Sequence, residues 1–386
     1  MQRFYALSAL VILGVGSAHA GDGEFKSMFN GKDLTGWHNV NCAPGTFYVK
    51  DNMIITTGKP TGYLRTAKQY ENFILEFEWF HAPTPKGKKT VGNSGLFVWG
   101  DPLPAIGSGY TRSIEVQVLV NLDVKDTYTS QGDLFSIWGA TCKPDRPHPK
   151  GWERCLPNEN RCKGEYEWNH YRVTANDGIL KLAVNGKEVS GVYECNPRKG
   201  YLALESEGSE CRFKNLNIKE LPSTNPKPNE ICDVAKNFES LFTGLDLSGW
   251  KASDEQKNHW KMNDGVLSYN GKEKGQSSLW STTDYGDFEL VLDWRGPGSG
   301  DYGVKVRGSK KEDLIVLRSE KKATEWNRSV IRLKGDHVNL RTNGKAVVDD
   351  EIFPHKLAAK GPIALSTDGH AMQIRNVFIR ELKGNE

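Results

Sequence analysis

The sequence has almost no net charge, no long apolar run beyond its first twenty residues and no cysteine after residue 232. Lys and Arg total 51 against 48 Asp and Glu, a formal net charge of +3, so there is no electrostatic basis for DNA or RNA as the main partner. No later segment approaches the ~20 apolar residues of a membrane-spanning helix, and no long segment has helical periodicity. These absences exclude a nucleic-acid-binding protein, a multi-span membrane protein and a coiled coil.

Length and turn-forming residues are what the chain has in quantity. At roughly 100–200 residues per domain, 386 residues predict two domains. The 40 glycines and 17 prolines favour many turns over long helices, and 37% hydrophobic residues suffice for sizeable cores. We therefore expect two globular units that are rich in turns.

The first twenty residues have the pattern of a secretory signal peptide. Arg3 precedes an apolar run from Ala6 to Gly16, and Ala18-His19-Ala20 then forms an A-x-A cleavage signal. The alternative, a single membrane anchor, needs a longer apolar run than this one. We expect a mature chain that begins at Gly21, without a membrane anchor, in the periplasm or the extracellular space.

Export makes the cysteine count informative, because disulfides form in oxidising compartments. Seven cysteines predict up to three disulfides and one remaining thiol, in a pairing that the sequence does not determine. The alternative is a zinc site built from Cys142, His148, Cys155 and Cys162, although their spacing matches no compact paired-cysteine motif. The seven cysteines are Cys42, Cys142, Cys155, Cys162, Cys195, Cys211 and Cys232.

Internal similarity shows that the chain is two copies of one domain. The residues FNGKDLTGW, from position 29, recur as FTGLDLSGW, from position 242. Between matched segments the offset falls from 215 to 158, so copy one holds an insertion of about 57 residues, within about 86–160. Copy one spans 21–222 and copy two 235–386, with a proline-rich linker at 223–234. The matched segments are 29–37 with 242–250, 70–79 with 285–294, 167–169 with 325–327 and 200–221 with 361–382.

The local patterns of both copies are those of β-strands. Residues 73–79 alternate between apolar and acidic side chains, and residues 179–184 lead into Asn185-Gly186, a type I′ hairpin signal. Copy two repeats this arrangement at 338–342 and Asn343-Gly344. Short strands at such spacing predict an all-β fold of two tandem jelly-roll sandwiches.

Two groups of polar residues in copy one are candidates for chemistry. Asn93 and Ser94 lie between glycines directly before a strand, where they either present polar groups at a sheet rim or simply close a turn. In the segment from Arg112 to Leu119, Glu115 and Gln117 share one strand face, which is either solvated or lines a groove that binds a sugar.

A third group is Glu205 and Glu207, which point the same way and are able to share a proton or a divalent cation. Copy two has Ser366 in place of the first of these acids, and its counterparts of Glu115 and Gln117 are expected to fall in the segment that it lacks. The acids are therefore not a requirement of the scaffold. No nucleophile elbow, phosphate loop or dinucleotide motif competes with them.

Each copy resembles the bacterial 3-keto-disaccharide hydrolase domain family. The motifs that carry the resemblance are residues 29–37, Asn93-Ser94-Gly95, Glu115-Val116-Gln117, Glu167-Trp168-Asn169 and residues 213–216, and it covers nearly all of both copies. It implies a concanavalin A-like, LamG-type jelly roll that acts on carbohydrate. The family usually has Gln and His near the last strand pair, where copy one has Glu205 and Glu207.

The resemblance implies cleavage of a 3-keto-glycoside by proton removal at C2, elimination and hydration. Glu115 would be the base or a metal ligand, and Glu205 or Glu207 the acid or a second ligand. Asn93, Ser94 and Gln117 would bind the substrate, and Arg112 would either stabilise developing charge or face solvent. No cofactor is implied with certainty beyond a possible divalent cation. The alternative is a non-catalytic, lectin-like tandem module, and the enzyme interpretation requires these residues to converge on one concave face.

Overall fold

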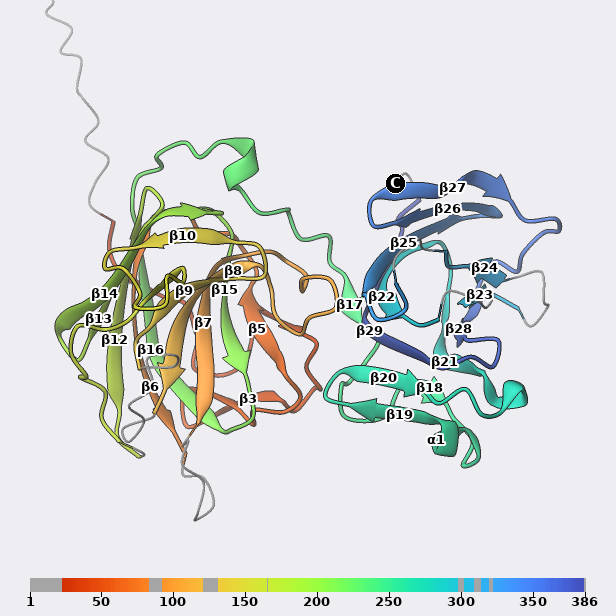
Figure 1. Ribbon diagram of the computed structural model, residues 1–386, viewed down its shortest axis with the longest axis horizontal. Helices are drawn as coiled ribbons and strands as arrows, with labels where there is room; N and C mark the ends of the chain where they lie inside the picture. The colour runs from red at the N-terminus through yellow and green to blue at the C-terminus, as the bar shows by residue number, and fades with distance from the viewer. Residues whose placement is uncertain are drawn as a thin grey trace, which may run out of the picture.

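The computed structural model describes residues 23–82, 92–120, 131–164, 166–297, 302–308, 314–318 and 322–384. The predicted signal peptide lies outside these residues. Figure 1 shows two β-sandwiches side by side, the first drawn in red to green and the second in cyan to blue. Within the described ranges, no helix is both long enough and apolar enough to cross a membrane.

The first sandwich consists of two antiparallel sheets (Figure 1). Its nine-stranded sheet has the order β10 (Thr141–Pro144), β14 (Lys187–Asn196), β13 (Ile179–Val184), β12 (Asn169–Asn176), β6 (Phe73–His81), β16 (Cys211–Glu220), β4 (Met53–Thr56) and β3 (Phe47–Lys50), and β1 (Lys26–Ser27) pairs with β16. Its seven-stranded sheet has the order β11 (Arg154–Cys155), β9 (Leu134–Ile137), β8 (Ser113–Leu119), β7 (Asn93–Gly100), β15 (Tyr201–Ser206), β5 (Gly62–Thr66) and β2 (Trp37–Val40).

The second sandwich repeats this plan with fewer strands. Its eight-stranded sheet has the order β19 (Trp260–Asn263), β20 (Val266–Tyr269), β29 (Met372–Glu381), β22 (Phe288–Arg295), β25 (Asn327–Lys334), β26 (His337–Thr342) and β27 (Lys345–Ile352), and β17 (Glu239–Ser240) pairs with β29. Its five-stranded sheet has the order β18 (Trp250–Lys251), β21 (Ser278–Tyr285), β28 (Gly361–Ser366), β23 (Gly303–Val306) and β24 (Leu314–Val316). The described helical residues are one turn, α1 (Gln256–His259), and two 3-10 turns at Pro228–Glu230 and Lys274–Gln276. The predicted all-β fold of two tandem jelly-roll sandwiches is therefore confirmed.

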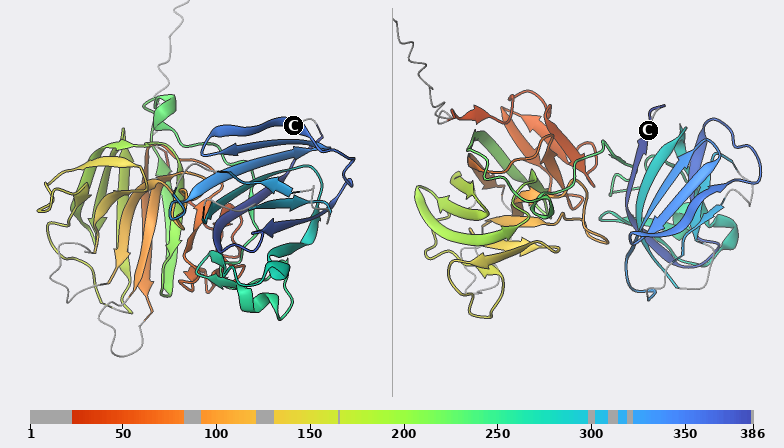
Figure 2. Two further views of the ribbon diagram at one scale, coloured as in Figure 1. Left: turned by 45° about the vertical axis from the view of Figure 1, so that its right-hand side comes forward. Right: turned by 90° about the horizontal axis from the view of Figure 1, so that it is seen from above.

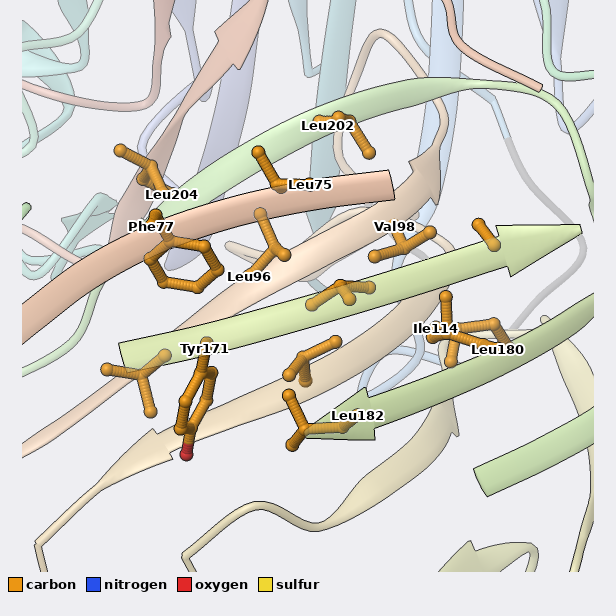
Figure 3. Packing of buried hydrophobic residues seen from close by; sticks show 14 of the residues in the cluster. Leu75, Phe77, Leu96, Val98, Ile114, Tyr171, Leu180, Leu182, Leu202 and Leu204 are labelled. Atoms are coloured by element: carbon orange, nitrogen blue, oxygen red, sulfur yellow. The ribbon is translucent and has the colours of Figure 1, made fainter. Parts of the chain in front are cut away.

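The core of the first sandwich lies between its two sheets (Figure 3). Strand β6 buries Leu75 and Phe77 on the inner face and leaves its glutamates outside, which is the alternation that the sequence predicts. Leu96 of β7 and Ile114 of β8 meet them from the opposite sheet. Full burial of each such side chain stabilises the fold by roughly 1.5–3 kcal/mol relative to exposure.

Local turn chemistry and the insertion account for how the sheets are joined. Asn185 and Gly186 both have positive φ, at 47° and 88°, as the predicted type I′ turn requires, and Asn343-Gly344 repeats this geometry. The predicted insertion in copy one supplies β9, β10 and β11, which extend both sheets of the first sandwich. The linker runs from the first sandwich to the second as one segment of the chain, as the right-hand view of Figure 2 shows.

The two sandwiches pack against each other through their outer sheet faces. The face of the seven-stranded sheet turned away from the core meets the outer face of the eight-stranded sheet in a shared apolar cluster. That cluster consists of Val40, Tyr63, Phe97 and Ala203 from copy one and Val291 and Phe378 from copy two, with Leu103, Tyr110, Ile137, Phe238 and Val330 packed against it.

The β7–β8 loop, residues 101–112, is held by polar side chains of copy two. Asp293 accepts a hydrogen bond from the Gly107 backbone N–H at 2.9 Å, and Asn376 Nδ2 donates to the Ser108 carbonyl at 2.8 Å. Arg328 Nη2 donates to the Pro104 carbonyl at 2.8 Å. These bonds from copy two add to the hydrogen bonds within the loop, such as Ala105 N–H to the Tyr110 carbonyl, and help to fix its conformation.

Candidate functional site

Strand β8 places its acid and its amide on the face of the seven-stranded sheet opposite the core. Ile114 and Val116 enter the core, so Glu115 and Gln117 point the other way. That face is covered rather than solvated, because Glu115 is only 7% exposed and Gln117 3%. The structure therefore excludes the solvated interpretation of this strand face.

Glu115 and Glu205 meet above Gly95, the residue of β7 that lies between their strands. A Cβ atom at position 95 would lie 2.9 Å from Glu115 Oε1 and 3.0 Å from Glu205 Oε2. The absence of a side chain at Gly95 therefore creates the space that both carboxylates occupy. Sequence reasoning assigned Gly95 only to a turn motif, although its position between two polar strands was a signal for this role.

Glu207 lies beside this pair and is held by donors from two other elements. Tyr110 of the β7–β8 loop donates its hydroxyl to Glu207 Oε1 at 2.8 Å, and Asn93 donates its amide to Glu207 Oε2. Gln117 Nε2 in turn donates to Asn93 Oδ1 at 2.6 Å. Asn93, Glu115, Gln117, Glu205 and Glu207 thus converge on one face, as the enzyme interpretation requires. We call these five residues the acidic cluster.

Two predicted site residues lie outside the acidic cluster. The Ser94 hydroxyl donates to the backbone carbonyl of Glu205 at 2.8 Å and is fully buried, so it joins β7 to β15. Arg112 precedes β8 and forms a bidentate ion pair with Asp101, at 2.8 and 3.0 Å. The structure does not bring Arg112 to the acidic cluster, because its side chain is directed to Asp101 on the neighbouring segment.

Two residues that the sequence did not single out contribute to this face. Tyr110 contacts Glu207, and burial together with the negative charge of Glu207 raises the pKa of its hydroxyl. Arg154 of β11, from the insertion, donates to the buried Asp133 at 2.6 Å, and its charge lowers the pKa of Glu115 against the effect of burial. Both residues act over long sequence separations, so no local pattern marks them.

The three glutamates have raised pKa values because they are buried and lie close to one another. Burial, followed by the charge of Glu207, raises the pKa of Glu115 from 4.5 to about 8. Burial and the other two acids raise the pKa of Glu205 well above its ordinary range. Burial also raises the pKa of Glu207, although the bonds from Tyr110 and Asn93 oppose that shift. All three shifts favour the protonated carboxyl, so the cluster holds protons at a pH at which ordinary glutamates are ionised.

The sequences of both copies match one known family. The model of the 3-keto-alpha-glucoside-1,2-lyase-like domain matches residues 24–219, 237–319 and 315–380. The chain belongs to this family. No curated protein matches the chain.

Several solved structures are similar to about half of this chain at low sequence identity. A crystal structure of a presumed glycosyl hydrolase from Parabacteroides distasonis is 22% identical over 52% of this chain and 94% of its own, with a TM-score of 0.39. The carbohydrate-binding module CBM66 from Bacillus subtilis is 12% identical over 48% and 96%, with a TM-score of 0.34. The exoplasmic/lumenal domain of VIP36 bound to Ca2+ and mannose is 9% identical over 54% and 94%, with a TM-score of 0.37.

Copy two, the second 3-keto-alpha-glucoside-1,2-lyase-like domain, has other residues at positions of the acidic cluster. Strand β24 pairs with β23 as β8 pairs with β7, and the register puts Leu314 and Val316 at the positions of Glu115 and Gln117. The expectation that these positions fall in a missing segment is therefore wrong. Ser366 occupies the position of Glu205, as the sequence alignment of the copies indicates.

The cysteines do not form the predicted disulfides in this structure. All seven are free thiols, and six of them are buried. They are distributed over several strands; Cys42, for example, faces the Tyr63 carbonyl, and Cys232 the Trp99 carbonyl. The disulfide expectation rested on the count alone and not on any pairing geometry.

The described residues contain no group of three His, Cys, Asp or Glu side chains that could hold a metal ion. Cys142, His148, Cys155 and Cys162, the residues of the zinc alternative, therefore do not come together as such a group. The same is true of the acidic cluster, in which Glu115 and Glu205 meet while Glu207 bonds to Tyr110 and Asn93. Within the described part of the chain, neither set of residues forms a metal centre.

The raised pKa values predict how stability depends on pH. The folded chain holds a proton on Glu115 up to about pH 8, whereas the unfolded chain releases it near pH 4.5, and the pKa values of Glu205 and Glu207 are raised in the same direction. Their contribution to the free energy of unfolding is therefore complete below the lower value and is lost as the pH rises through the upper one. Urea unfolding in chelator between about pH 5 and pH 8.5 should show this decline, with a smaller slope for Glu115→Gln. A free energy of unfolding that stays constant over this pH range contradicts the raised pKa values.

Substitution of Gly95 by alanine tests the space between the carboxylates. The new Cβ would approach Glu115 and Glu205 more closely than ordinary van der Waals contact, so at least one carboxylate must move. We expect the rate of any reaction that uses both groups to fall by about tenfold or more, since small displacements of reacting groups are costly. Gly45→Ala is the matched control, because no atom lies within 4 Å of a Cβ built there. Equal activity of the two variants contradicts the role of Gly95 in positioning the two carboxylates.

Proposed function

We propose that copy one is an exported enzyme that cleaves 3-keto-glycosides or 3-keto-disaccharides. The observation that carries the proposal is the meeting of Glu115 and Glu205 above Gly95, where burial and the neighbouring carboxylates raise the pKa of both. Family membership supports the substrate class. A ketone at C3 of a sugar acidifies the C2 proton, so the reaction needs a base and an acid in one site.

The first step uses Glu115 as the base. Its ionised carboxylate takes the proton from C2, and the electron pair of the C–H bond moves to form an enolate on the C3 oxygen. A pKa near 8 makes Glu115 a far stronger base than an ordinary glutamate while leaving part of it ionised at neutral pH. Asn93 donates one of its two amide hydrogens to Glu207, and the other is the nearby donor that orients the sugar and stabilises the developing negative charge.

The second step uses Glu205 as the acid. The enolate expels the glycosidic oxygen from C1, and protonated Glu205 supplies the proton that the leaving oxygen needs. Its pKa is raised well above the ordinary range, which keeps it protonated for this role. Water then adds its oxygen to C1, one water proton restores Glu205, and Glu115 returns its proton to C2, so both carboxyls regain their starting states. Glu207 stays bound to Tyr110 and Asn93 and orients these two donors.

The decisive experiment is turnover of a 3-keto-glucoside by the purified mature chain, with and without chelator. We expect release of the leaving group and of 3-keto-glucose, and the chelated sample reports whether a divalent cation is needed. Absence of turnover by folded protein in both samples contradicts the enzyme proposal. Binding of the same compound without turnover would then support the non-catalytic carbohydrate-binding module.

A further inference from the structure

A second cavity lies between the two copies and is separate from the acidic cluster. Its volume is about 820 Å³, within the range of small-molecule sites, and clefts between domains are common ligand sites. None of the five residues of the acidic cluster lines it. Its walls come from β2 and β5, the β7–β8 loop, the linker and the outer face of the eight-stranded sheet. The residues that the argument uses are His38, Arg65, Leu103, Asp233, Val291 and Phe378.

Arg65 is a buried cation in this cavity that lacks a counter-charge. It is 5% exposed, and no carboxylate in the described part of the chain forms an ion pair with it. Its Nη1 donates to the Thr66 carbonyl at 2.9 Å and its guanidinium lies 4.8 Å from the ring centroid of Tyr201, but its Nε has no hydrogen-bond partner. A buried charge without a partner is costly, so this position favours a bound anion.

The other charged groups of the buried wall are already neutralised. Arg328 binds Asp293 through two hydrogen bonds, at 2.7 and 2.9 Å. Glu289 accepts from Arg380 at 2.7 Å and lies 3.9 Å from Lys236. Asp233 and Glu239 also line the cavity but are exposed at its rim, so Arg65 is the buried charge of this wall that has no carboxylate partner among the described residues, and it suits a negatively charged group of a ligand.

The remaining surface of the cavity indicates what surrounds that negative charge. Val291 and Phe378 of copy two and Leu103 of the loop form an apolar wall, suited to the C–H face of a sugar ring. Asp233 of the linker is exposed at the rim, where its carboxylate can accept hydrogen bonds from hydroxyl groups. We propose that this cavity binds a sugar that carries a carboxylate, with the carboxylate on Arg65. This inference does not depend on the reaction proposed for the acidic cluster.

Binding of D-glucuronate to the full mature chain, measured by isothermal titration calorimetry, tests the proposal. We expect one bound glucuronate per chain, and a loss of affinity of about tenfold or more in Arg65→Gln, because a charge-assisted bidentate contact is removed. Neutral D-glucose should not bind here, and glucose 6-phosphate should bind more weakly than glucuronate. Glu115→Gln should bind glucuronate as the wild type does, since the acidic cluster is elsewhere.

Matched controls separate this result from misfolding. Arg172→Gln removes an arginine that is ion-paired with Glu76 on the other sheet, and it should leave glucuronate binding unchanged. Hydrogen exchange of the wild type should show that glucuronate protects β5 and residues 233–238, a readout that needs no variant. Equal affinity of Arg65→Gln and wild type overturns the proposal, as does protection confined to β7 and β8 or preference for glucose 6-phosphate.

Discussion

Substitution of Glu115 by glutamine is expected to lower kcat/KM for a 3-keto-glucoside by about 10²–10⁴-fold, the usual contribution of a general base. Glutamine has nearly the same shape but cannot accept the C2 proton. The loss should therefore appear in kcat, with little change in KM. Steady-state kinetics at several pH values measure it, and the rise of activity with pH through about 8 should disappear with the carboxylate.

The same variant should fold at least as well as the wild type. Removing one of three neighbouring acids relieves repulsion with Glu205 and Glu207, so the thermal midpoint should not fall. Glu76→Gln is the control, because Glu76 lies on the other sheet in an ion pair with Arg172. Unchanged turnover by Glu115→Gln removes this residue from catalysis.

Substitution of Asp293 by alanine is expected to have the largest effect on stability. Asp293 is fully buried between the copies and accepts hydrogen bonds from Arg328, from Asn376 and from the Gly107 backbone. Its removal takes the counter-charge from Arg328, whose side chain is 20% exposed, and takes an acceptor from Asn376 and from the Gly107 N–H. Breaking a buried ion pair in this way costs about 3–5 kcal/mol. Urea unfolding of the full chain measures the loss.

A surface aspartate provides the comparison for this variant. Asp254 is exposed and pairs with Lys257, so Asp254→Ala should leave the free energy of unfolding almost unchanged. Asp293→Ala should also loosen the β7–β8 loop, which hydrogen exchange of residues 101–112 reports directly. Equal stability of the two variants contradicts the role of Asp293 at the interface.

The sequence predicts those features that local patterns encode. The alternation along β8 places Glu115 and Gln117 on one face, and Asn185-Gly186 specifies its hairpin, because side-chain direction and turn type depend on neighbouring residues. Tyr110 and Arg154 were missed because their roles depend on which strands become neighbours. Arg112 was predicted for the site from its nearness to Glu115 in sequence, but alternation and Asp101 direct it elsewhere.

The position of copy two was also beyond the reach of local patterns. Asp293, Arg328 and Asn376 look like ordinary surface polar residues of an outer sheet face until the second sandwich is placed against the first. Likewise, Leu314 and Val316 are recognisable as the counterparts of Glu115 and Gln117 only from strand register. Residues that are distant in sequence must be placed by tertiary structure before their chemistry can be read.

The hydrogen bonds from copy two to the β7–β8 loop indicate a role for a domain that lacks the acidic cluster. Tyr110, which orients Glu207, belongs to a segment whose carbonyls and N–H groups are held by Asp293, Asn376 and Arg328. The outer sheet face of copy two is therefore the part of this domain that acts on copy one. A substitution there reaches the acidic cluster through the β7–β8 loop without changing any of its five residues.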